Sequence, residues 1–395
     1  MNDMYNIKTL NKISTIGLAK LDNTKYNIGD DVENPDGILV RSAKMHDMQF
    51  NKELLCIARA GAGTNNIPLD RCSEEGIVVF NTPGANADAV KELALCALLL
   101  SSRDIIGGAQ WINSIADKGS EIGALVEKNK STFVGPEIKG KTLGVIGLGA
   151  IGAKIANDAL SLGMEVYGYD PYLTVDSAWS LSSKIKRATD VNTIYEHSDY
   201  ITIHIPYLES TKNFINADAI GLMKDGVRVI NLARGELVDA DAIVAAVNTG
   251  KVARYVTDFP NEKVVGVKNI IALPHLGAST PESEDNCAIM AAREMRDYLE
   301  NGNINNSVNF GKAAISHSCD PRLCVFHKNI PDMIAQVTRS VSSRGINIEN
   351  MVNATKKGSG IAYTMLELTT EPDKALVDTI AAIDGVIRVR TISNL

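Results

Sequence analysis

The stretch TLGVIGLGAIGAKIANDALSLGMEVYGYD, residues 142–170, decides the fold of this chain. Gly147, Gly149 and Gly152 form a G-x-G-x-x-G pattern between an apolar strand and a helix, and Asp170 closes the next strand about 20 residues on. The first glycine permits a tight turn, the second lets a pyrophosphate approach the backbone, and the third allows close helix packing. Because the helix N-terminus adds partial positive charge, the stretch predicts a dinucleotide site.

The acid at the end of the second strand indicates which dinucleotide binds. Asp170 would accept hydrogen bonds from the adenosine ribose, and its carboxylate would repel a 2′-phosphate. The residues that follow it, Pro171, Tyr172 and Leu173, offer no arginine to hold such a phosphate. We therefore expect NAD rather than NADP as the cofactor.

A regular series of apolar strands extends downstream from this stretch. Strands separated by helical or loop segments predict an α/β fold with a doubly wound parallel sheet. Upstream, from Gly37 to Phe80, short β-branched runs alternate with polar stretches, which is also typical of parallel α/β units. The expected strands of the main series are 142–147, 165–170, 200–206, 227–233, 254–258 and 269–274.

Two helices are expected to connect the parts of the chain. Residues 85–104 contain no Pro or Gly, and their apolar positions nearly surround the helix, as in a long buried helix that crosses between domains. A helix over 281–300 opens with Pro in its first turn and is expected to pack back onto the first domain. The following residues, up to Pro321, are rich in Asn, Gly and Ser and are interpreted as a linker.

Beyond the linker the pattern of the chain changes. The expected elements are a strand over 322–327, a helix over 331–345, strands over 346–355 and 361–369, a helix over 373–385 and a strand over 386–392. This βαββαβ order predicts a small α+β sandwich of the ferredoxin-like type.

Composition excludes several classes of protein. At about 150 residues per domain, 395 residues allow two or three domains. With 45% hydrophobic and 22% charged residues, the chain is neither disordered nor fibrous. A net charge of −7 and the absence of any run of five Lys or Arg argue against nucleic-acid binding. The longest strongly apolar stretch, Leu93 to Leu100, is less than half of the roughly 20 residues that a membrane span needs.

The N-terminus and the cysteines indicate the compartment. The first residues lack the layout of a secretory signal, so a cytoplasmic protein is expected. No C-x-x-C pair occurs, which favours reduced thiols over disulfides or zinc, and we expect no metal site. The six cysteines are at positions 56, 72, 96, 287, 319 and 324.

Reactive side chains follow the later strands of the main series. Carboxyl ends of parallel strands converge on the ligand crevice of a doubly wound sheet. His275 is suited to take a hydroxyl proton, a buried acid beside it (Asp258 or Glu262) would stabilise the imidazolium, and Arg234 would grip a substrate carboxylate. Their joint occurrence after a dinucleotide fingerprint predicts an alcohol-oxidising enzyme.

The other histidines are assigned no catalytic role. His204 lies inside the apolar strand 200–206 and is interpreted as a buried structural residue that lines the cofactor cleft. His46, His197 and His317 occur in polar stretches without a partner pattern and are expected on the surface.

Over nearly its whole length the chain resembles the D-isomer-specific 2-hydroxyacid dehydrogenases. The resemblance implies two Rossmann-like domains, the outer one discontinuous (1–102 with 282–303) and the other NAD-binding (103–281), then a linker (304–321) and a C-terminal domain (322–395). It also implies NAD-dependent oxidation of D-3-phosphoglycerate to 3-phosphohydroxypyruvate, the first step of phosphorylated L-serine biosynthesis. It rests on RSA (41–43), RAGAGTNNI (59–67), NTPGANADAVKELAL (81–95), GLGAIG (147–152), LARGELVD (232–239) and PHLGAST (274–280).

The same resemblance implies the roles of individual residues. Arg234 would anchor the carboxylate and polarise the carbonyl, Glu262 would be the partner of the histidine, and His275 would be the general acid/base. The family pattern D-V-F-x-x-E-P is one residue shorter here, from Asp258 to Lys263, and lacks the final Pro. The NAD site would be lined by Thr64, Gly147, Gly149, Ala150, Ile151, Gly152, Asp170, Pro206, Leu232, Ala233, Asp258, His275 and Gly277.

Substrate and effector residues are implied as well. The backbone at Ala60 and Gly61 would meet the substrate carboxylate, and Arg41, Lys44 and Arg59 supply positive charge of the kind that a phosphate requires. Residues 322–395 resemble the ACT regulatory domain. Its effector, L-serine, would be held between two chains of a homodimer or homotetramer by His327, Asn329 and Asn347.

Two other functions remain open at this point. One is oxidation of another D-2-hydroxy acid, such as 2-hydroxyglutarate (or reduction of 2-oxoglutarate), glycerate or lactate. The other is a non-catalytic NAD-sensing protein, since corepressors with this fold keep the same residues. An ACT domain, which senses amino acids, argues against the second.

Overall fold

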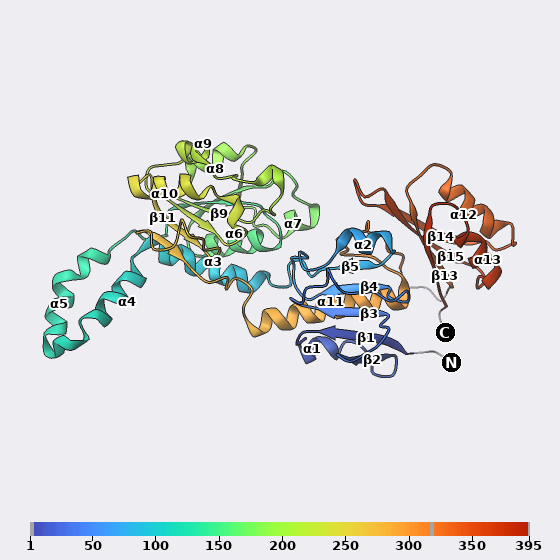
Figure 1. The fold of residues 1–395 in the computed structure, drawn as a ribbon. Coiled ribbons are helices and arrows are strands. Elements are labelled where there is room, and N and C mark those ends of the chain that lie inside the picture. The colour runs from blue at the N-terminus through green and yellow to red at the C-terminus, as the bar shows by residue number, and fades with distance from the viewer. Residues whose placement is uncertain (1–3, 317–319, 394–395) are drawn as a thin grey trace. The chain divides into compact units, whose positions relative to one another are not determined.

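A computed structural model describes residues 4–316 and 320–393 of the chain. It divides into two compact units, one formed by Met1–Asn86 with Pro281–Leu395 and the other by Ala87–Thr280 (Figure 1). The expectations for His317 and Cys319 lie outside the described residues. Among the described residues, no helix combines the length and the apolar character that crossing a membrane requires.

The unit Ala87–Thr280 is built on a parallel sheet of strand order β12-β11-β10-β9-β6-β7-β8. Its inner strands β6, β9, β10 and β11 are mostly buried because both faces are covered, which confirms the expected doubly wound architecture. The strands are β6 (Thr142–Ile146), β7 (Glu165–Tyr169), β8 (Lys186–Arg187), β9 (Tyr200–Ile203), β10 (Val227–Asn231), β11 (Val252–Thr257) and β12 (Ile270–Ala272).

Helices cover the two faces of this sheet. Apolar residues of α3 and α6 form one core with the sheet, and those of α8, α9 and α10 form the other. The helical elements are α3 (Ala87–Ser102), α4 (Ile105–Ser114), η1 (Ala116–Glu121), α5 (Ile122–Asn129), η2 (Lys130–Phe133), α6 (Ala150–Ser161), α7 (Val175–Trp179), α8 (Val191–His197), η3 (Glu209–Thr211), α9 (Ala217–Leu222), η4 (Gly235–Leu237) and α10 (Ala240–Thr249).

Three helices of this unit present apolar side chains without burying them. The expected all-round burial of the 85–104 helix is wrong, because α3 buries one face and leaves Cys96 and Leu99 exposed. The next helices, α4 and α5, contain no buried residue at all, although α4 carries Ile105 and Ile112. Their apolar faces are therefore uncovered in the single chain.

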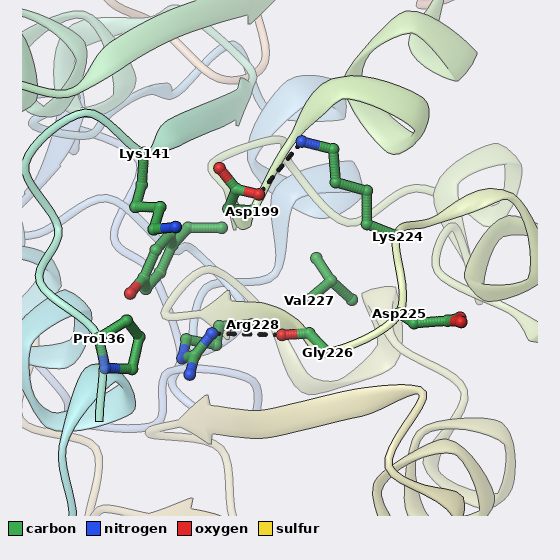
Figure 2. A pocket seen from close by; sticks show the side chains of 9 residues that line it. Pro136, Lys141, Asp199, Lys224, Asp225, Gly226, Val227 and Arg228 are labelled. Carbon is green, nitrogen blue, oxygen red and sulfur yellow. Dashed lines mark hydrogen bonds and ion pairs between the residues drawn. The ribbon is translucent and has the colours of Figure 1, made fainter. Parts of the chain in front are cut away.

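A pocket of about 220 Å³ opens at the amino ends of β6, β9 and β10 (Figure 2). Its walls include Lys141, Asp199 and Arg228, each placed at or just before the start of one of these strands. The pocket therefore lies at the edge of the sheet opposite to the one that carries the dinucleotide fingerprint.

The first part of the other unit is a smaller parallel sheet of order β2-β1-β3-β4-β5. The long helix α11 covers one face with Ala288, Ala291 and Met295, and α2 contributes Cys72 to the core on the other. The elements are β1 (Tyr5–Leu10), α1 (Thr15–Leu18), β2 (Tyr26–Gly29), β3 (Gly37–Val40), β4 (Cys56–Arg59), α2 (Leu69–Glu74), β5 (Val78–Phe80) and α11 (Pro281–Asn301).

The C-terminal part has the expected βαββαβ order. Its antiparallel sheet has the strand order β14-β15-β13-β16, and α12 and α13 cover one of its faces. The elements are β13 (Arg322–Lys328), α12 (Met333–Ser342), β14 (Ile348–Thr355), β15 (Ile361–Leu368), α13 (Lys374–Ala381) and β16 (Val386–Ile392).

The other face of this sheet packs against the first part of the same unit. Cys324, Phe326 and Tyr363 share one core with Tyr298 of α11 and with Phe310. The rings of Phe310 and Phe326 lie 5.0 Å apart, and those of Phe326 and Tyr363 lie 4.6 Å apart. The C-terminal domain is thus joined to the α11 side of the unit by a continuous hydrophobic core.

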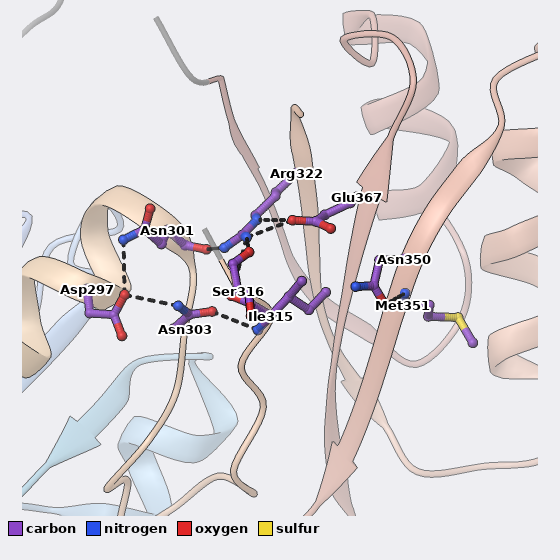
Figure 3. Close-up of polar contacts among 9 residues, drawn as sticks. All are labelled: Asp297, Asn301, Asn303, Ile315, Ser316, Arg322, Asn350, Met351 and Glu367. Atoms are coloured by element: carbon purple, nitrogen blue, oxygen red, sulfur yellow. Dashed lines mark hydrogen bonds and ion pairs between the residues drawn. The ribbon is translucent and has the colours of Figure 1, made fainter. Parts of the chain in front are cut away.

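Two arginines of the C-terminal sheet donate hydrogen bonds to the last carbonyls of α11. The buried Arg322 donates to the carbonyl of Asn301 at 2.6 Å and to Glu367 Oε1 at 2.7 Å (Figure 3). Arg390 donates to the carbonyls of Tyr298, at 3.0 Å, and of Leu299. The last carbonyls of a helix have no partner within the helix, so these arginines add donors there, beside the Gly302 N–H on Tyr298 and the Tyr5 hydroxyl on Leu299.

The segment read as a linker is packed rather than loose. Phe310 is 3% exposed, and Asn309 accepts a hydrogen bond from Val79 N and donates one to the carbonyl of Ile77. The side chain of Asn309 therefore pairs with the backbone at the open edge strand β5. Its Asn-rich composition suggested a solvated linker because the scattered apolar residues follow neither a helical nor a strand period.

The boundary near α3 also differs from the expected one. Contacts assign α3 to the unit Ala87–Thr280, so this unit begins at Ala87 rather than at residue 103. The physical reason is that Val90, Ala94 and Leu98 pack with the α6 side of the sheet in that unit.

Candidate functional site

The turn between β6 and α6 has no room for side chains at two of its glycines. Gly147 has a φ of +90°, and a Cβ placed on it would lie 2.6 Å from the carbonyl oxygen of His204. A Cβ on Gly152 would lie 1.9 Å from the carbonyl oxygen of Gly147. The turn therefore requires glycine at both positions. This allows the start of α6 to pack directly against the end of β6.

The start of α6 is open to a ligand. Gly149 caps the helix without a side-chain hydrogen bond, and nothing lies within 4 Å of where its Cβ would be. The first N–H groups of the helix, at Ala150 and Ile151, need external acceptors because no residue precedes them in the helix. This cradle fits a pyrophosphate, which supports NAD binding here.

Asp170 follows β7 beside the turn. Its Oδ2 accepts the Leu148 N–H at 2.9 Å, and its Oδ1 accepts the Tyr172 N–H at 2.8 Å. Each carboxylate oxygen has a second lone pair, so both can still accept from ribose hydroxyls. The carboxylate is thus held next to the glycine turn, as the NAD assignment requires.

Side chains from three strand ends meet at the same edge of the sheet. Arg234 follows β10, Phe259 follows β11 and His275 follows β12. The Arg234 guanidinium lies 5.9 Å from the centre of the Phe259 ring, and the His275 ring lies 4.6 Å from it. Arg234 and His275 are exposed, so both can reach a ligand.

Asp258 is the buried carboxylate of this edge. It is 1% exposed, and its Oδ2 accepts the Gly277 N–H at 3.1 Å. Burial raises the pKa of Asp258, while that hydrogen bond and the nearby charges of His275 and Arg234 act in the opposite direction. Its Oδ1 is buried without a hydrogen-bond partner among the described residues, so a donor from a bound ligand fits there.

Glu262 is not brought to the histidine. It is exposed on the loop after β11, and no hydrogen bond or ion pair joins it to His275 in the part of the chain that the structure describes. The shortened loop is the physical reason, since one residue fewer after Asp258 leaves the chain less length to turn back. Asp258 is instead the carboxylate whose charge interacts with His275.

His204 has a structural environment. Its Nε2 pairs with Thr202 Oγ1 at 2.8 Å, and burial lowers the pKa of His204 to about 3. The ring is therefore neutral near pH 7. This agrees with its interpretation as a residue that supports the cleft.

The remaining expected cofactor residues divide between the units. Pro206 follows β9, Leu232 and Ala233 follow β10, and Gly277 follows β12, all at the edge that carries the fingerprint. Thr64 belongs to the other unit, in the loop after β4.

Cationic side chains gather at the carboxyl ends of β3 and β4 in the first unit. Arg41 pairs with Glu284 of α11 at 2.6 Å, and Arg59 Nε donates to the Arg41 carbonyl at 3.1 Å. Gly61 has a φ of +153°, and a Cβ on it would lie 2.4 Å from the Arg59 guanidinium. Lys44 is exposed in the loop that follows Arg41.

Several supporting residues were not predicted from the sequence. Glu284 holds Arg41, Asn231 Nδ2 donates to the Arg234 carbonyl at 2.8 Å, and Asn81 Nδ2 donates to the Ala62 carbonyl at 2.6 Å. Phe259 packs on His275. Asn81 lies within the motif 81–95 and Phe259 within the stretch 258–263, but no local pattern marks Glu284 or Asn231 as parts of a site.

The expected effector residues occupy different environments. His327 is 1% exposed, with its ring nitrogens on the Lys328 carbonyl and Thr364 Oγ1, each at 2.8 Å. It lies inside the sandwich, which corrects its expected place at an interface, because β13 is a central strand of the sheet. Asn329 and Asn347 are exposed, as an effector site requires.

Comparison with known proteins establishes the family. Residues 96–277 match the family described as D-isomer specific 2-hydroxyacid dehydrogenase, NAD binding domain. The D-3-phosphoglycerate dehydrogenase of Haemophilus influenzae is 31% identical over 352 residues, which cover 86% of this chain and 82% of that protein. The chain belongs to the D-isomer-specific 2-hydroxyacid dehydrogenases, and residues 96–277 lie in its NAD-binding domain.

Individual relatives differ in name. The D-3-phosphoglycerate dehydrogenase of Synechocystis is 33% identical over 306 residues, 75% of this chain, which spans about half (52%) of that protein. The hydroxypyruvate reductase of Thermotoga maritima is 37% identical over 261 residues, which cover 63% of this chain and 80% of that protein. The NAD⁺-bound 3-phosphoglycerate dehydrogenase of Entamoeba histolytica shares the fold, with a TM-score of 0.60 at 23% identity over 78% of this chain and 99% of that one.

Substitution of Asp170 tests the cofactor preference. We expect Asp170→Asn to weaken NAD binding about tenfold, since a bond to a charged acceptor contributes roughly 1.5–3 kcal/mol. The ratio of NAD to NADP affinity should also fall, because the repelling charge is gone. Titration calorimetry with both nucleotides measures this. Glu165→Gln, at the other end of β7, is the control, and an unchanged ratio in Asp170→Asn would contradict the assignment.

Proposed function

We propose that this chain oxidises D-3-phosphoglycerate to 3-phosphohydroxypyruvate with NAD, the first step of the phosphorylated route to L-serine. The observation that carries the enzymatic part is the grouping of Arg234, Asp258 and His275 at the edge of the sheet that bears the dinucleotide fingerprint. The relatives named D-3-phosphoglycerate dehydrogenase support the choice of substrate.

The arrangement suits oxidation of a 2-hydroxy acid. Arg234 would hold the substrate carboxylate through paired N–H donors, which fixes the carbon that bears the hydroxyl. His275 would take the hydroxyl proton, and the electron pair of the O–H bond would form the C=O bond. The hydrogen on the same carbon would leave with the electron pair of its C–H bond as hydride, so a ketone remains. Bound NAD⁺ supplies the acceptor for that hydride. The buried charge of Asp258 would stabilise the imidazolium that forms on His275.

The phosphate of the substrate is assigned to Arg41, Lys44 and Arg59. Arginine forks bind phosphate oxygens bidentately, and a lysine adds a point charge. The Arg41–Glu284 pair is nearly half exposed on both sides, so a phosphate dianion can compete with the glutamate at small cost.

A second candidate is reduction of hydroxypyruvate, the reverse of glycerate oxidation. The identity of 37% with a hydroxypyruvate reductase favours it. This substrate has no phosphate, so the cationic group would then have no ligand.

A substrate panel separates these functions. We expect the kcat/KM for D-3-phosphoglycerate to exceed those for D-glycerate, D-2-hydroxyglutarate and D-lactate. Lys44→Gln should lower kcat/KM for phosphoglycerate by roughly tenfold and leave glycerate unchanged, because one charge-assisted contact is lost. NADH formation measures this, with Lys52→Gln, before the amino end of β4, as the control. A higher kcat/KM for glycerate would refute the phosphate assignment, and no turnover at all would favour an NAD-sensing protein.

Variants of His275 and of the two carboxylates test the proposed proton transfer. His275→Ala should lower kcat by about 10²–10⁴-fold with little change in NAD binding. Asp258→Asn should lower kcat by a larger factor than Glu262→Gln, since the Asp258 charge interacts with His275 and no contact between Glu262 and His275 is found among the described residues. Steady-state kinetics and NAD titration of the three variants measure this. If Glu262→Gln is the more damaging change, Glu262 reaches the histidine in the working enzyme.

Assembly and compartment are part of the same proposal. The uncovered apolar faces of α3, α4 and α5 fit a second copy of this chain, so we propose a homodimer or homotetramer. A cytoplasmic enzyme is proposed on the same ground as the reaction, the relatives named D-3-phosphoglycerate dehydrogenase.

L-Serine is proposed as a feedback inhibitor bound by the C-terminal domains. Asn329 follows the end of β13 that pairs with Ile361, whereas Asn347 precedes the end of β14 that pairs with Leu368. The two residues therefore lie at opposite ends of the sheet in one chain. Antiparallel pairing of two exposed β14 edges would bring Asn329 near the partner's Asn347, so the site needs two chains.

Inhibition would be transmitted through packed contacts. Arg322 and Arg390 link the effector domain to the last turn of α11, and Glu284 in the first turn pairs with Arg41. Residues 304–316 are packed rather than loose, so the proposed route does not use this segment as a hinge. Deletion of residues 322–395 would uncover the core around Tyr298 and Phe310, so point variants of the full chain are the better test.

Serine titrations test this regulation. We expect L-serine to inhibit phosphoglycerate oxidation, with a coupling of about 5–150-fold in affinity. Asn347→Ala should abolish the inhibition and keep the basal rate, while Asn350→Ala, exposed on the edge strand β14 that follows Asn347, should behave like the parent. Initial rates against L-serine, with D-serine as a comparison, measure this. A parent enzyme indifferent to millimolar L-serine would refute the proposal.

A further inference from the structure

The pocket at the amino ends of β6, β9 and β10 contains cationic groups that no part of the proposed reaction uses. Lys141, Lys224 and Arg228 line it together with Asp199 and Asp225 (Figure 2). β10 spans five residues from this edge to the catalytic edge, which is roughly 16 Å. A ligand in the pocket therefore cannot be a reactant at Arg234 or His275.

The acidic residues of the pocket are already paired. Asp225 Oδ1 lies 2.8 Å from Lys251 Nζ. Asp199 accepts the Thr142 N–H at 2.9 Å and pairs with Lys224 at 3.1 Å. Burial alone would raise the pKa of Asp199, but the Thr142 hydrogen bond and the Lys224 charge hold it below its usual value. Both carboxylates are therefore ionised and occupied near pH 7.

The cationic side chains of the pocket have N–H donors that are available to a ligand. Arg228 Nε donates to the Ser101 carbonyl at 2.9 Å, and its Nη1 donates to the Gly226 carbonyl at 3.2 Å. A guanidinium has five N–H donors, so donors on Nη1 and Nη2 remain. Lys141 is exposed, and within the described residues its side-chain ammonium forms no hydrogen bond or ion pair. The Arg228 guanidinium is also fixed above the Tyr200 ring, 5.3 Å from its centre.

The charge balance and the size of the pocket define its ligand. Lys141, Lys224 and Arg228 oppose only Asp199, because Asp225 is neutralised by Lys251 outside the pocket lining. A volume of about 220 Å³ is below the range of roughly 300–1,000 Å³ that larger organic ligands occupy. We propose that this pocket binds a small tetrahedral dianion, either inorganic phosphate or the phosphate of a small monoester, away from the catalytic edge.

A bound phosphate would connect three segments of the NAD-binding unit. Arg228 holds the last turn of α3 through Ser101, Lys141 belongs to the loop before β6, and Lys224 precedes β10. An anion shared by Arg228 and Lys141 adds charge-assisted bonds between these segments. Binding should therefore stabilise this unit, and the stabilisation should rise with the logarithm of the ligand concentration once that exceeds Kd.

Binding is tested with the full chain at constant ionic strength. The probes are inorganic phosphate, sulfate, glycerol 3-phosphate and, as a singly charged comparison, acetate. The thermal midpoint should rise with phosphate, sulfate and the monoester but not with acetate. Hydrogen exchange should slow in peptides covering 136–142 and 223–229. Comparison of phosphate with glycerol 3-phosphate decides whether the free ion or the ester is preferred.

Variants identify the pocket among other anion sites of the chain. Lys141→Gln should weaken phosphate binding about tenfold and remove the slowed exchange at 136–142 and 223–229. Lys139→Gln, an exposed lysine of the same loop outside the pocket, should match the parent. Phosphate bound at Lys44 and Arg59 would persist in Lys141→Gln and slow exchange in the other unit. Equal affinity in Lys141→Gln and the parent, or no slowed exchange at these two segments, would refute the proposal.

Discussion

The close approach of the β6 end and the α6 start is the constraint on which the cofactor site depends. A carbon atom added at Gly152 would meet the Gly147 carbonyl at 1.9 Å, and one at Gly147 would meet the His204 carbonyl at 2.6 Å. Because neither glycine carries a side chain, the Leu148 N–H can donate to Asp170, and the first N–H groups of α6 remain accessible to a ligand. The groups expected to hold the pyrophosphate and the adenosine ribose are thus placed by one tight turn.

The catalytic side chains depend on the same sheet in a different way. Parallel strands end at a common edge, so residues separated by more than forty positions in the chain become neighbours. Arg234 and His275 contact one ring, Phe259, and Asp258 is buried behind them with one oxygen engaged by Gly277 N. The pocket at the opposite edge shows that the sheet also gathers charges where strands begin, at Lys141, Asp199 and Arg228.

In the other unit, α11 is the shared element. Its buried face packs on the parallel sheet, its first turn holds Arg41 through Glu284, and its last carbonyls accept from Arg322 and Arg390. Arg322 and Glu367 form a buried ion pair, which is favourable only because further acceptors satisfy the guanidinium. The C-terminal domain is therefore packed as part of its unit, and the chain passes between units only at 86–87 and 280–281.

The local sequence determined the elements and the chemistry that each can carry. The glycine turn, Asp170, the strands that end before Arg234 and His275, and the βαββαβ order of the C-terminal part all follow from periodicity and residue type, which act over a few positions. Tertiary structure decided which groups meet. The burial of His327 in a central strand, the one-sided burial of α3 and the packing of residues 304–316 depend on contacts between distant segments. Such contacts leave no periodic trace in the sequence, because a single side chain such as Asn309 can satisfy a strand edge more than 200 residues away.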